Sequence, residues 1–200
     1  MLEVAQTSHI PLILGLDAGG RPVDWLPWQE AVTLLVRDEI AWFAGSQNIQ
    51  IRGGNNHVSG ERTVIELSSI VAIRNARSLY TDDVTPPLTN DGLFRRDHNL
   101  CLYCGERYPS SLLTRDHIMP QSRGGASTWE NCATSCRCCN QRKSDKSCEE
   151  AGMKLLAVPY APSRIEALLL RNKRVLADQM EFLLAHLPKD RRVFERNYVG

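Results

Sequence analysis

Four cysteines in two Cys-x-x-Cys pairs have the clearest chemistry in this sequence. The pairs are Cys101 with Cys104 and Cys136 with Cys139, and residues 105–135 separate them. Two such pairs supply the four thiolates of a closed tetrahedral zinc site, which leaves no open position for catalysis. We therefore expect a structural Zn²⁺ that ties the two ends of this segment together. Cys138 could replace Cys139 as a ligand, although its spacing from Cys136 is less favourable.

The residues between and beside these pairs could hydrolyse a phosphodiester. Asp116 offers a carboxylate, the ligand type that Mg²⁺ prefers, and the imidazole of His117 can take a proton from water. Asn140, directly after Cys139, offers a carbonyl oxygen as a second metal ligand. Asn131 can hold either a loop or the backbone of the histidine through side-chain hydrogen bonds. Hydrolysis needs an activated water and a positive centre near the developing charge, so this set predicts a one-metal nuclease.

The charge of the same segment favours a phosphate-containing partner. The whole chain carries 24 Lys and Arg against 23 Asp and Glu, but residues 95–146 carry nine basic and five acidic side chains. A locally basic segment in a near-neutral protein is typical of a phosphate-binding site, although a solvated face has the same composition. The side chains that we expect to contact nucleic acid are Arg123, Arg142 and Lys143.

Short elements must position these residues. The sequence predicts a strand over 112–118, a loop over 119–128 and a helix that opens at 138–143. Neighbouring side chains on a strand point to opposite faces, so Asp116 and His117 would work from different sides unless the strand ends or twists there. Two Ser-x-x-Glu spacings are typical of capping boxes. Ser127 with Glu130 predicts a short helical turn, and Ser147 with Glu150 predicts a short helix through about Met153.

The rest of the chain predicts a mixed module and a helical segment. We expect a hairpin over 10–25, a helix over 28–39, strands over 40–45, 49–53 and 63–73, and helices over 163–187 with a turn at 171–174. Polar residues with two adjacent prolines predict a linker. The expected parts are an N-terminal module of residues 1–75, a linker of 76–98, a zinc-bound nuclease domain of 99–153 and a C-terminal helical segment of 154–200.

The composition indicates a cytoplasmic protein that does not span a membrane. No apolar run reaches the ~18 residues that a membrane span needs. The first residues lack the basic start and apolar core of a signal peptide. Thiols stay reduced in the cytoplasm, which favours metal binding over disulfides. The cysteines outside the zinc set, Cys132, Cys138 and Cys148, are expected to be ordinary thiols.

The motifs CLYC, LTRDHIMPQSRGG, WEN and CRCCNQRK together resemble the HNH endonucleases of the ββα-metal (His-Me finger) class, in their four-cysteine zinc form. The resemblance covers residue 101 to about residue 153. It implies that Asp116 and Asn140 bind one Mg²⁺ or Mn²⁺ and that His117 is the general base. It also implies that Asn131 orients the histidine. This sequence has asparagine in the last position of the motif, which still supplies an oxygen ligand.

The resemblance also implies the fold class and the substrate. The expected fold is α+β, with a zinc-bound ββα-metal unit between an N-terminal mixed α/β module and C-terminal helices. The expected activity is endonucleolytic cleavage of double-stranded DNA, with 5′-phosphate and 3′-hydroxyl ends. Two alternatives stay open: a non-catalytic, zinc-stabilised module that binds nucleic acid, and a nuclease directed at RNA.

Overall fold

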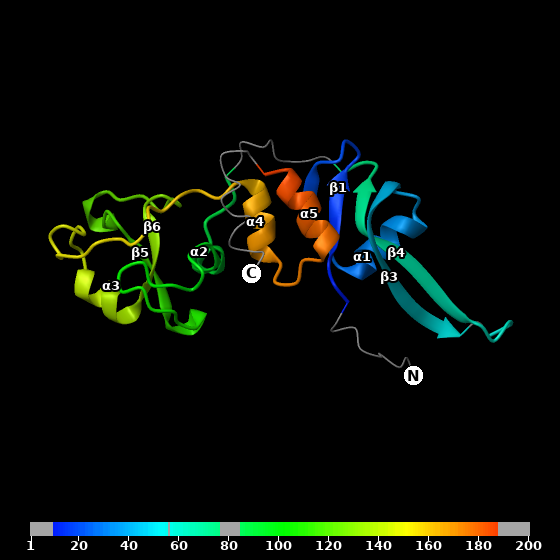
Figure 1. The fold of residues 1–200 in the computed structure, drawn as a ribbon, viewed down its shortest axis with the longest axis horizontal. Helices are drawn as coiled ribbons and strands as arrows, with labels where there is room; N and C mark the ends of the chain where they lie inside the picture. Colours follow the sequence, from blue (N-terminus) through cyan, green and yellow to red (C-terminus); the bar gives the residue numbers. More distant parts are fainter. Residues whose placement is uncertain (1–9, 56, 77–84, 188–200) are drawn as a thin grey trace. The chain divides into compact units, whose positions relative to one another are not determined.

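The computed structural model describes residues 10–55, 57–76 and 85–187 (Figure 1). The fold is α+β, as the sequence predicted. The chain divides into two compact units, one made of residues 1–81 and 172–200 and the other of residues 82–171. Parts of the expected linker (77–84) and of the expected C-terminal segment (188–200) lie outside the described residues. Among the residues described, no helix combines the length and the apolar character that crossing a membrane requires.

The first unit is built on a four-stranded sheet. Its strands are β1 (Ile13–Asp17), β2 (Pro22–Leu26), β3 (Ile40–Asn55) and β4 (Arg62–Ile73), in the order β2-β1-β4-β3. The antiparallel pairing of β1 with β2 confirms the predicted hairpin, and β1 pairs with β4 in parallel. Helix α1 (Trp28–Val36) follows Pro27. Proline suits a helix start because it has no backbone N–H, and the first N–H groups of a helix have no partner within the helix. Its buried Ala31 packs into a core with Ile13, Leu26 and Val71.

Two predicted strands are one strand in the structure. β3 runs without a break from Ile40 to Asn55, but its register against β4 shifts between Ala44 and Asn48. Gly45, at the start of this shift, has φ +88°. A Cβ there would lie 2.3 Å from Oγ of Ser69, so only glycine fits. Gly45, the last residue of the strand predicted over 40–45, therefore marks an irregularity within one longer strand.

The second unit contains a hairpin followed directly by a helix. Its elements are α2 (Asn90–Arg96), the short helix Ser110–Leu112, β5 (Leu113–His117), the short helix Gln121–Arg123, β6 (Cys132–Cys136), α3 (Arg137–Lys143) and α4 (Arg164–Arg171). β5 and β6 are antiparallel, with His117 opposite Cys132 and Leu113 opposite Cys136. The elements follow one another in the order β5-β6-α3. Because α3 begins directly after Cys136, it starts beside Leu113, the first residue of β5.

The remaining helical predictions have mixed outcomes. Helix α2, within the stretch expected to be a linker, was not predicted; the side chain of Thr89 caps it. The predicted turn at 171–174 is confirmed, because α4 ends at Arg171 and α5 (Ala177–Ala185) begins after it. Ser147 and Glu150 make both capping-box hydrogen bonds, but the chain continues as turns rather than as a helix. Near Ser127 and Glu130 the chain makes a turn over residues 129–131, and the side chain that accepts there, from the N–H of Asn131, belongs to Thr128.

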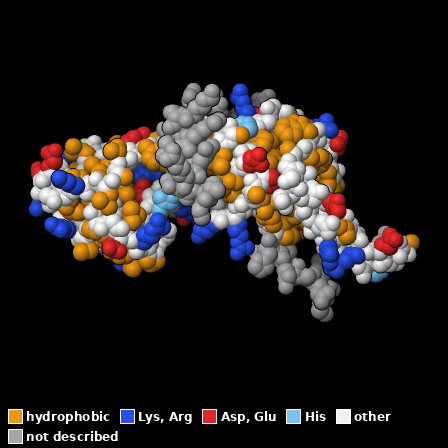
Figure 2. All heavy atoms as spheres, viewed as in Figure 1, with side chains coloured by type: hydrophobic (Ala, Val, Ile, Leu, Met, Phe, Trp, Pro, Cys, Tyr) orange, Lys and Arg blue, Asp and Glu red, His pale blue; other side chains and the backbone are white. Residues whose placement is uncertain are grey.

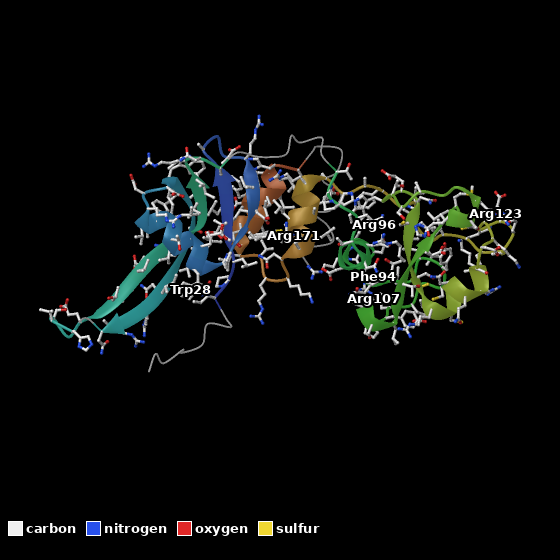
Figure 3. The ribbon with its side chains drawn as sticks, turned by 180° about the vertical axis from the view of Figure 1, so that it is seen from behind. Trp28, Phe94, Arg96, Arg107, Arg123 and Arg171 are labelled. Carbon is white, nitrogen blue, oxygen red and sulfur yellow. The ribbon has the colours of Figure 1, made fainter. Side chains whose placement is uncertain are left out.

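A buried arginine organises the second unit from within. Arg96, at the end of α2 (Figure 3), pairs with the neighbouring Asp97 at 2.8 Å. Its guanidinium also donates to the backbone carbonyls of Trp129 at 2.7 Å and Cys132 at 2.9 Å. The carboxylate of Asp97 accepts from the backbone N–H of Thr134. These bonds attach α2 to β6 and satisfy the buried charges, which would otherwise be costly.

Candidate functional site

The four cysteines of the two pairs lie together. The sulfurs of Cys101, Cys104, Cys136 and Cys139 are all within 4.8 Å of one another. In a tetrahedral zinc site with Zn–S bonds of about 2.3 Å, the sulfurs are about 3.8 Å apart. Shifts of about 1 Å or less would therefore complete the site, so these residues fit zinc. Cys138 is exposed and outside this cluster, which decides between it and Cys139.

The thiols of this cluster differ in their pKa values. Burial opposes the ionisation of Cys101, but backbone N–H groups of Cys136, Cys104 and Tyr103 lower its pKa to about 7. Burial, and then the neighbouring thiols, raise the pKa of Cys139 well above its usual range. One thiol therefore ionises easily and another resists until a positive charge is present. A zinc ion would supply that charge.

The second cysteine pair fixes the start of α3 against β5. Cys136 caps the helix, with its sulfur accepting from the N–H of Cys139 at 3.4 Å. One residue later, Nδ2 of Asn140 donates to Oγ1 of Thr114 at 2.8 Å and to the carbonyl of Arg115 at 3.4 Å. This amide orientation leaves the carbonyl oxygen of Asn140 as the atom that could bind a metal.

One helical turn further on, Lys143 contacts the end of the same strand. Its ammonium donates to the carbonyl of His117 at 2.7 Å and lies 3.2 Å from Oδ1 of Asp116. Because residues three apart share a helix face, Asn140 and Lys143 together lay one face of α3 along β5. The helix therefore sets the position of the Asp116-His117 pair.

Asp116 lies in a polar cluster below the surface. Only 4% of the residue is exposed. Its Oδ1 pairs with Lys143, and its Oδ2 accepts a hydrogen bond from the hydroxyl of Tyr103, which stands between Cys101 and Cys104. Burial first, and then Asp116, raise the pKa of Tyr103, so the phenol keeps its proton and donates. The oxygens of Asp116 and Asn140 suit Mg²⁺ or Mn²⁺ by type, and a carboxylate has about four lone-pair positions, of which these contacts use two.

His117 is only partly buried and points its ring toward the following loop. Its Nε2 lies 2.9 Å from Oγ of Ser127. Burial is the largest influence on its pKa and lowers it; Arg115 and Lys143 lower it further, while Asp116 raises it. The net effect keeps the imidazole neutral at neutral pH. A neutral imidazole can accept a proton from water.

Asn131 binds the loop rather than the histidine ring. Its Oδ1 accepts from the N–H of Met119 at 2.9 Å, and its Nδ2 donates to the carbonyls of Met119 at 3.1 Å and Ala126 at 2.8 Å. The backbone of Gly125 lies close to Met119: a Cβ on Gly125 would lie 1.8 Å from the carbonyl oxygen of Met119. Asn131 therefore acts on His117 through the backbone: its side chain binds the loop, and its carbonyl accepts from the N–H of Ile118, the residue after the histidine, at 2.9 Å.

The three basic residues expected to contact nucleic acid have different environments. Arg142 is exposed, and Arg123 is exposed but makes two hydrogen bonds, of 2.7 and 2.8 Å, to the carboxylate of Glu150. Lys143 is fully buried, so the expected phosphate contact does not fit its position; its ammonium pairs with Asp116 instead. On the face that Figure 2 shows, Lys and Arg side chains are scattered among other residues and form no single basic surface.

Three further residues of the site were missed by sequence reasoning. Thr114 and Tyr103 bind Asn140 and Asp116, and Ser127 binds His117. A signal existed for Thr114, because it lies two residues before Asp116 and so shares its strand face. The contacts of Tyr103 and Ser127 depend on how the loops fold back, which spacing does not show.

Comparison with known proteins agrees with this geometry. Residues 101–156 match the family model described as HNH endonuclease. No curated protein and no solved structure matches the chain. The matched segment contains β5, β6, α3 and all four cysteines of the cluster. The predicted resemblance is thus confirmed: residues 101–156 match the HNH endonuclease family model and contain four cysteines positioned to bind a metal ion.

Proposed function

We propose that this protein is a metal-dependent endonuclease that hydrolyses phosphodiester bonds in double-stranded DNA. The observation that carries the proposal is the placement of α3 along β5. Asn140 and Lys143 contact four consecutive residues of that strand, from Thr114 to His117. An oxygen ligand from the helix is thereby set close to the strand that carries a carboxylate and a neutral imidazole. The family match supports a nuclease-type function for the same residues.

Each residue has a role in the proposed reaction. His117 takes a proton from water, which its lowered pKa allows at neutral pH. The activated water attacks the phosphorus and the bond to the 3′ oxygen breaks. The leaving 3′ oxygen takes a proton from solvent water, so the ends are a 5′-phosphate and a 3′-hydroxyl. Asp116 and Asn140 would bind Mg²⁺ or Mn²⁺, which supplies positive charge beside the phosphate. The four cysteines would bind a structural Zn²⁺, and Arg123 and Arg142 would contact the DNA backbone.

A plasmid-nicking assay tests the proposal. The zinc-loaded protein should convert supercoiled plasmid to the nicked form in Mg²⁺ or Mn²⁺ and not in a chelator that spares the zinc. His117→Ala should lower the rate by about 100-fold or more, the size of a lost general base. His57→Ala is the matched control, because His57 is exposed on a turn of the first unit. Equal cutting by His117→Ala and the parent would refute the assignment of the base.

One observation favours a second candidate, a non-catalytic zinc module that binds nucleic acid. Both oxygens of Asp116 are already engaged, by Lys143 and Tyr103, and the side chain is almost inaccessible. If this arrangement persists with substrate, Asp116 stabilises the fold instead of binding a metal. The protein would then bind DNA in a gel-shift experiment but would not cut plasmid in the presence of Mg²⁺ or Mn²⁺. Single-stranded RNA offered beside duplex DNA would identify an RNA-directed nuclease.

A further inference from the structure

The ring of His117 is bound by a serine that the motif does not include. Ser127 lies in the loop between β5 and β6, ten residues after the histidine. Its hydroxyl oxygen is 2.9 Å from Nε2 of His117 and 3.2 Å from Nε2 of Gln121, at the start of the short helix in the same loop. Two side chains therefore converge on this one hydroxyl.

We propose that Ser127 is the positioning residue of His117: its hydroxyl accepts a hydrogen bond from Nε2–H and leaves Nδ1 as the nitrogen that takes the proton from water. This inference rests on the proposed function, in which His117 is the general base. It assigns a role to a residue outside the Asp-His, Asn and Asn positions of the motif. It also names the reacting atom of the histidine.

The proposed role of His117 as general base selects this arrangement, because the base needs a ring nitrogen with a free lone pair. A neutral imidazole has one N–H and one nitrogen with a free lone pair, and the partner of one nitrogen decides the state of the other. A hydroxyl oxygen has two lone pairs, so Ser127 can accept from His117 and Gln121 together. If Ser127 donated to Nε2 instead, the proton would sit on Nδ1 and neither nitrogen would be free to accept. The oxygen and nitrogen of the Gln121 amide could also be exchanged. Ser127 would then donate its proton to the Gln121 oxygen, and its own oxygen would still accept from His117.

The loop is built to keep Ser127 in place. Asn131 binds the carbonyl of Ala126, the residue directly before Ser127, at 2.8 Å, and also binds both backbone groups of Met119. The backbone of Gly125 approaches Met119 too closely for any side chain. Asn131 therefore acts on the loop and Ser127 acts on the ring. The orienting role that the resemblance gives to Asn131 is divided between these two residues.

Nitrogen NMR of the zinc-loaded full chain, without Mg²⁺, tests the inference independently of catalysis. At a pH of about 8, where an ordinary imidazole is neutral, the parent should carry the proton on Nε2 of His117. In Ser127→Ala that proton should exchange with water about tenfold faster or more, because its acceptor is gone. Ser127→Thr keeps the hydroxyl and should preserve the slow exchange. Ser111→Ala, at an exposed serine in the short helix before β5, should match the parent.

Nicking kinetics supply the second measurement. Ser127→Ala should lower kcat by about 10- to 100-fold, as loss of an outer hydrogen-bond partner of a functional histidine does, with KM for plasmid unchanged. Ser127→Thr should recover most of that loss. A proton on Nδ1 in the parent, or Ser127→Ala with parental exchange and parental kcat, would overturn the inference. If the parent does not nick DNA, the proposed function fails, and the NMR result still decides whether Ser127 positions the ring.

Discussion

Lys143 and Asp116 form an ion pair inside the second unit, with Nζ 3.2 Å from Oδ1 and no part of the lysine side chain accessible to solvent. A buried ammonium is costly unless it is paired and hydrogen-bonded. Both conditions are met here, because the ammonium also donates to the carbonyl of His117. The pair therefore fixes α3 against the end of β5, where the proposed general base lies.

Replacing Lys143 by methionine should destabilise the protein by about 3–5 kcal/mol, the cost of leaving a buried charge without its partner. The methionine keeps most of the volume, so the loss would come from Asp116 and the carbonyl of His117. Urea unfolding of the zinc-loaded protein measures it. Lys146→Met removes an exposed lysine and should change the free energy of unfolding by less than about 0.5 kcal/mol. Similar values for the two variants would mean that the ion pair adds nothing.

The zinc cluster predicts different results for two nearby cysteines. Cys139 belongs to the cluster and Cys138 does not, although both lie in the first turn of α3. Cys139→Ser should lose zinc and the ordered structure of residues 101–143, because metal binding supplies folding free energy to a unit with a small core. Cys138→Ser should bind one zinc ion per chain with parental circular dichroism. Metal analysis checks both, and retention of zinc by Cys139→Ser would contradict the assigned ligand set.

The local elements could be predicted where one short stretch contains the whole signal. The Cys-x-x-Cys pairs, the alternation in 112–118 and the turn after Arg171 are such cases, and the structure confirms each of them. Thr89, the cap of α2, is an equally local signal. It follows two adjacent prolines, which are typical of a linker and led to that prediction instead. The strand predicted over 40–45 continues past Gly45 in the structure, because glycine occurs both at strand ends and at bends within a strand.

The contacts within the site could be predicted less well, because they join residues far apart in the chain. Lysine is almost always exposed, so Lys143 was expected on the surface; only the fold shows a carboxylate 27 residues away that pairs with it. The same holds for Arg96, whose partners lie in β6 and beside it. Serine is a common loop residue, and the contact of Ser127 with His117 depends on how the loop folds back, where Asn131 binds the carbonyl of Ala126.

The exposed pair of Arg123 and Glu150 predicts a change in DNA affinity. The carboxylate of Glu150 accepts two hydrogen bonds from one guanidinium nitrogen of Arg123. A phosphate group of DNA would compete with this carboxylate for the guanidinium. Glu150→Gln should release Arg123 and tighten binding to duplex DNA by about twofold to fivefold, the range expected for one exposed ion pair. Fluorescence anisotropy at low salt measures this, and the gain should shrink as salt rises.

The matched control for this pair is Glu149→Gln, which removes an equal charge from the exposed neighbouring residue. If it tightens binding as much as Glu150→Gln does, the effect is one of net charge and not of the pairing. Arg123→Ala should weaken binding in either case, because one phosphate contact is lost. Arg123→Ala with parental affinity would show that this arginine does not face the DNA.

Asp178 predicts an acid-sensitive contribution to the stability of the first unit. Its Oδ2 accepts from the N–H groups of Ser46 and Gln47 and from the hydroxyl of Ser69, so α5 holds the irregular part of β3. Burial acts to raise the pKa of Asp178, but the hydrogen bonds from Ser69, Gln47, Gln179 and Ser46 hold it below its ordinary value. The folded state therefore binds this proton less readily than the unfolded chain does.

The sign of the pH dependence follows from that lowered pKa. The stabilisation is complete above the unfolded pKa of about 3.9 and is lost as pH falls through the lower folded value. Asp178→Asn should cost about 1.5–3 kcal/mol at pH near 7, the contribution of hydrogen bonds to a charged group. The gap between parent and variant should narrow below pH of about 4.

Asp38→Asn, in an exposed pair with Arg74, should show little of either effect. Urea titrations at several pH values measure the gap, and a gap that stays constant into acid would mean that the charge of Asp178 is not what binds α5 to β3.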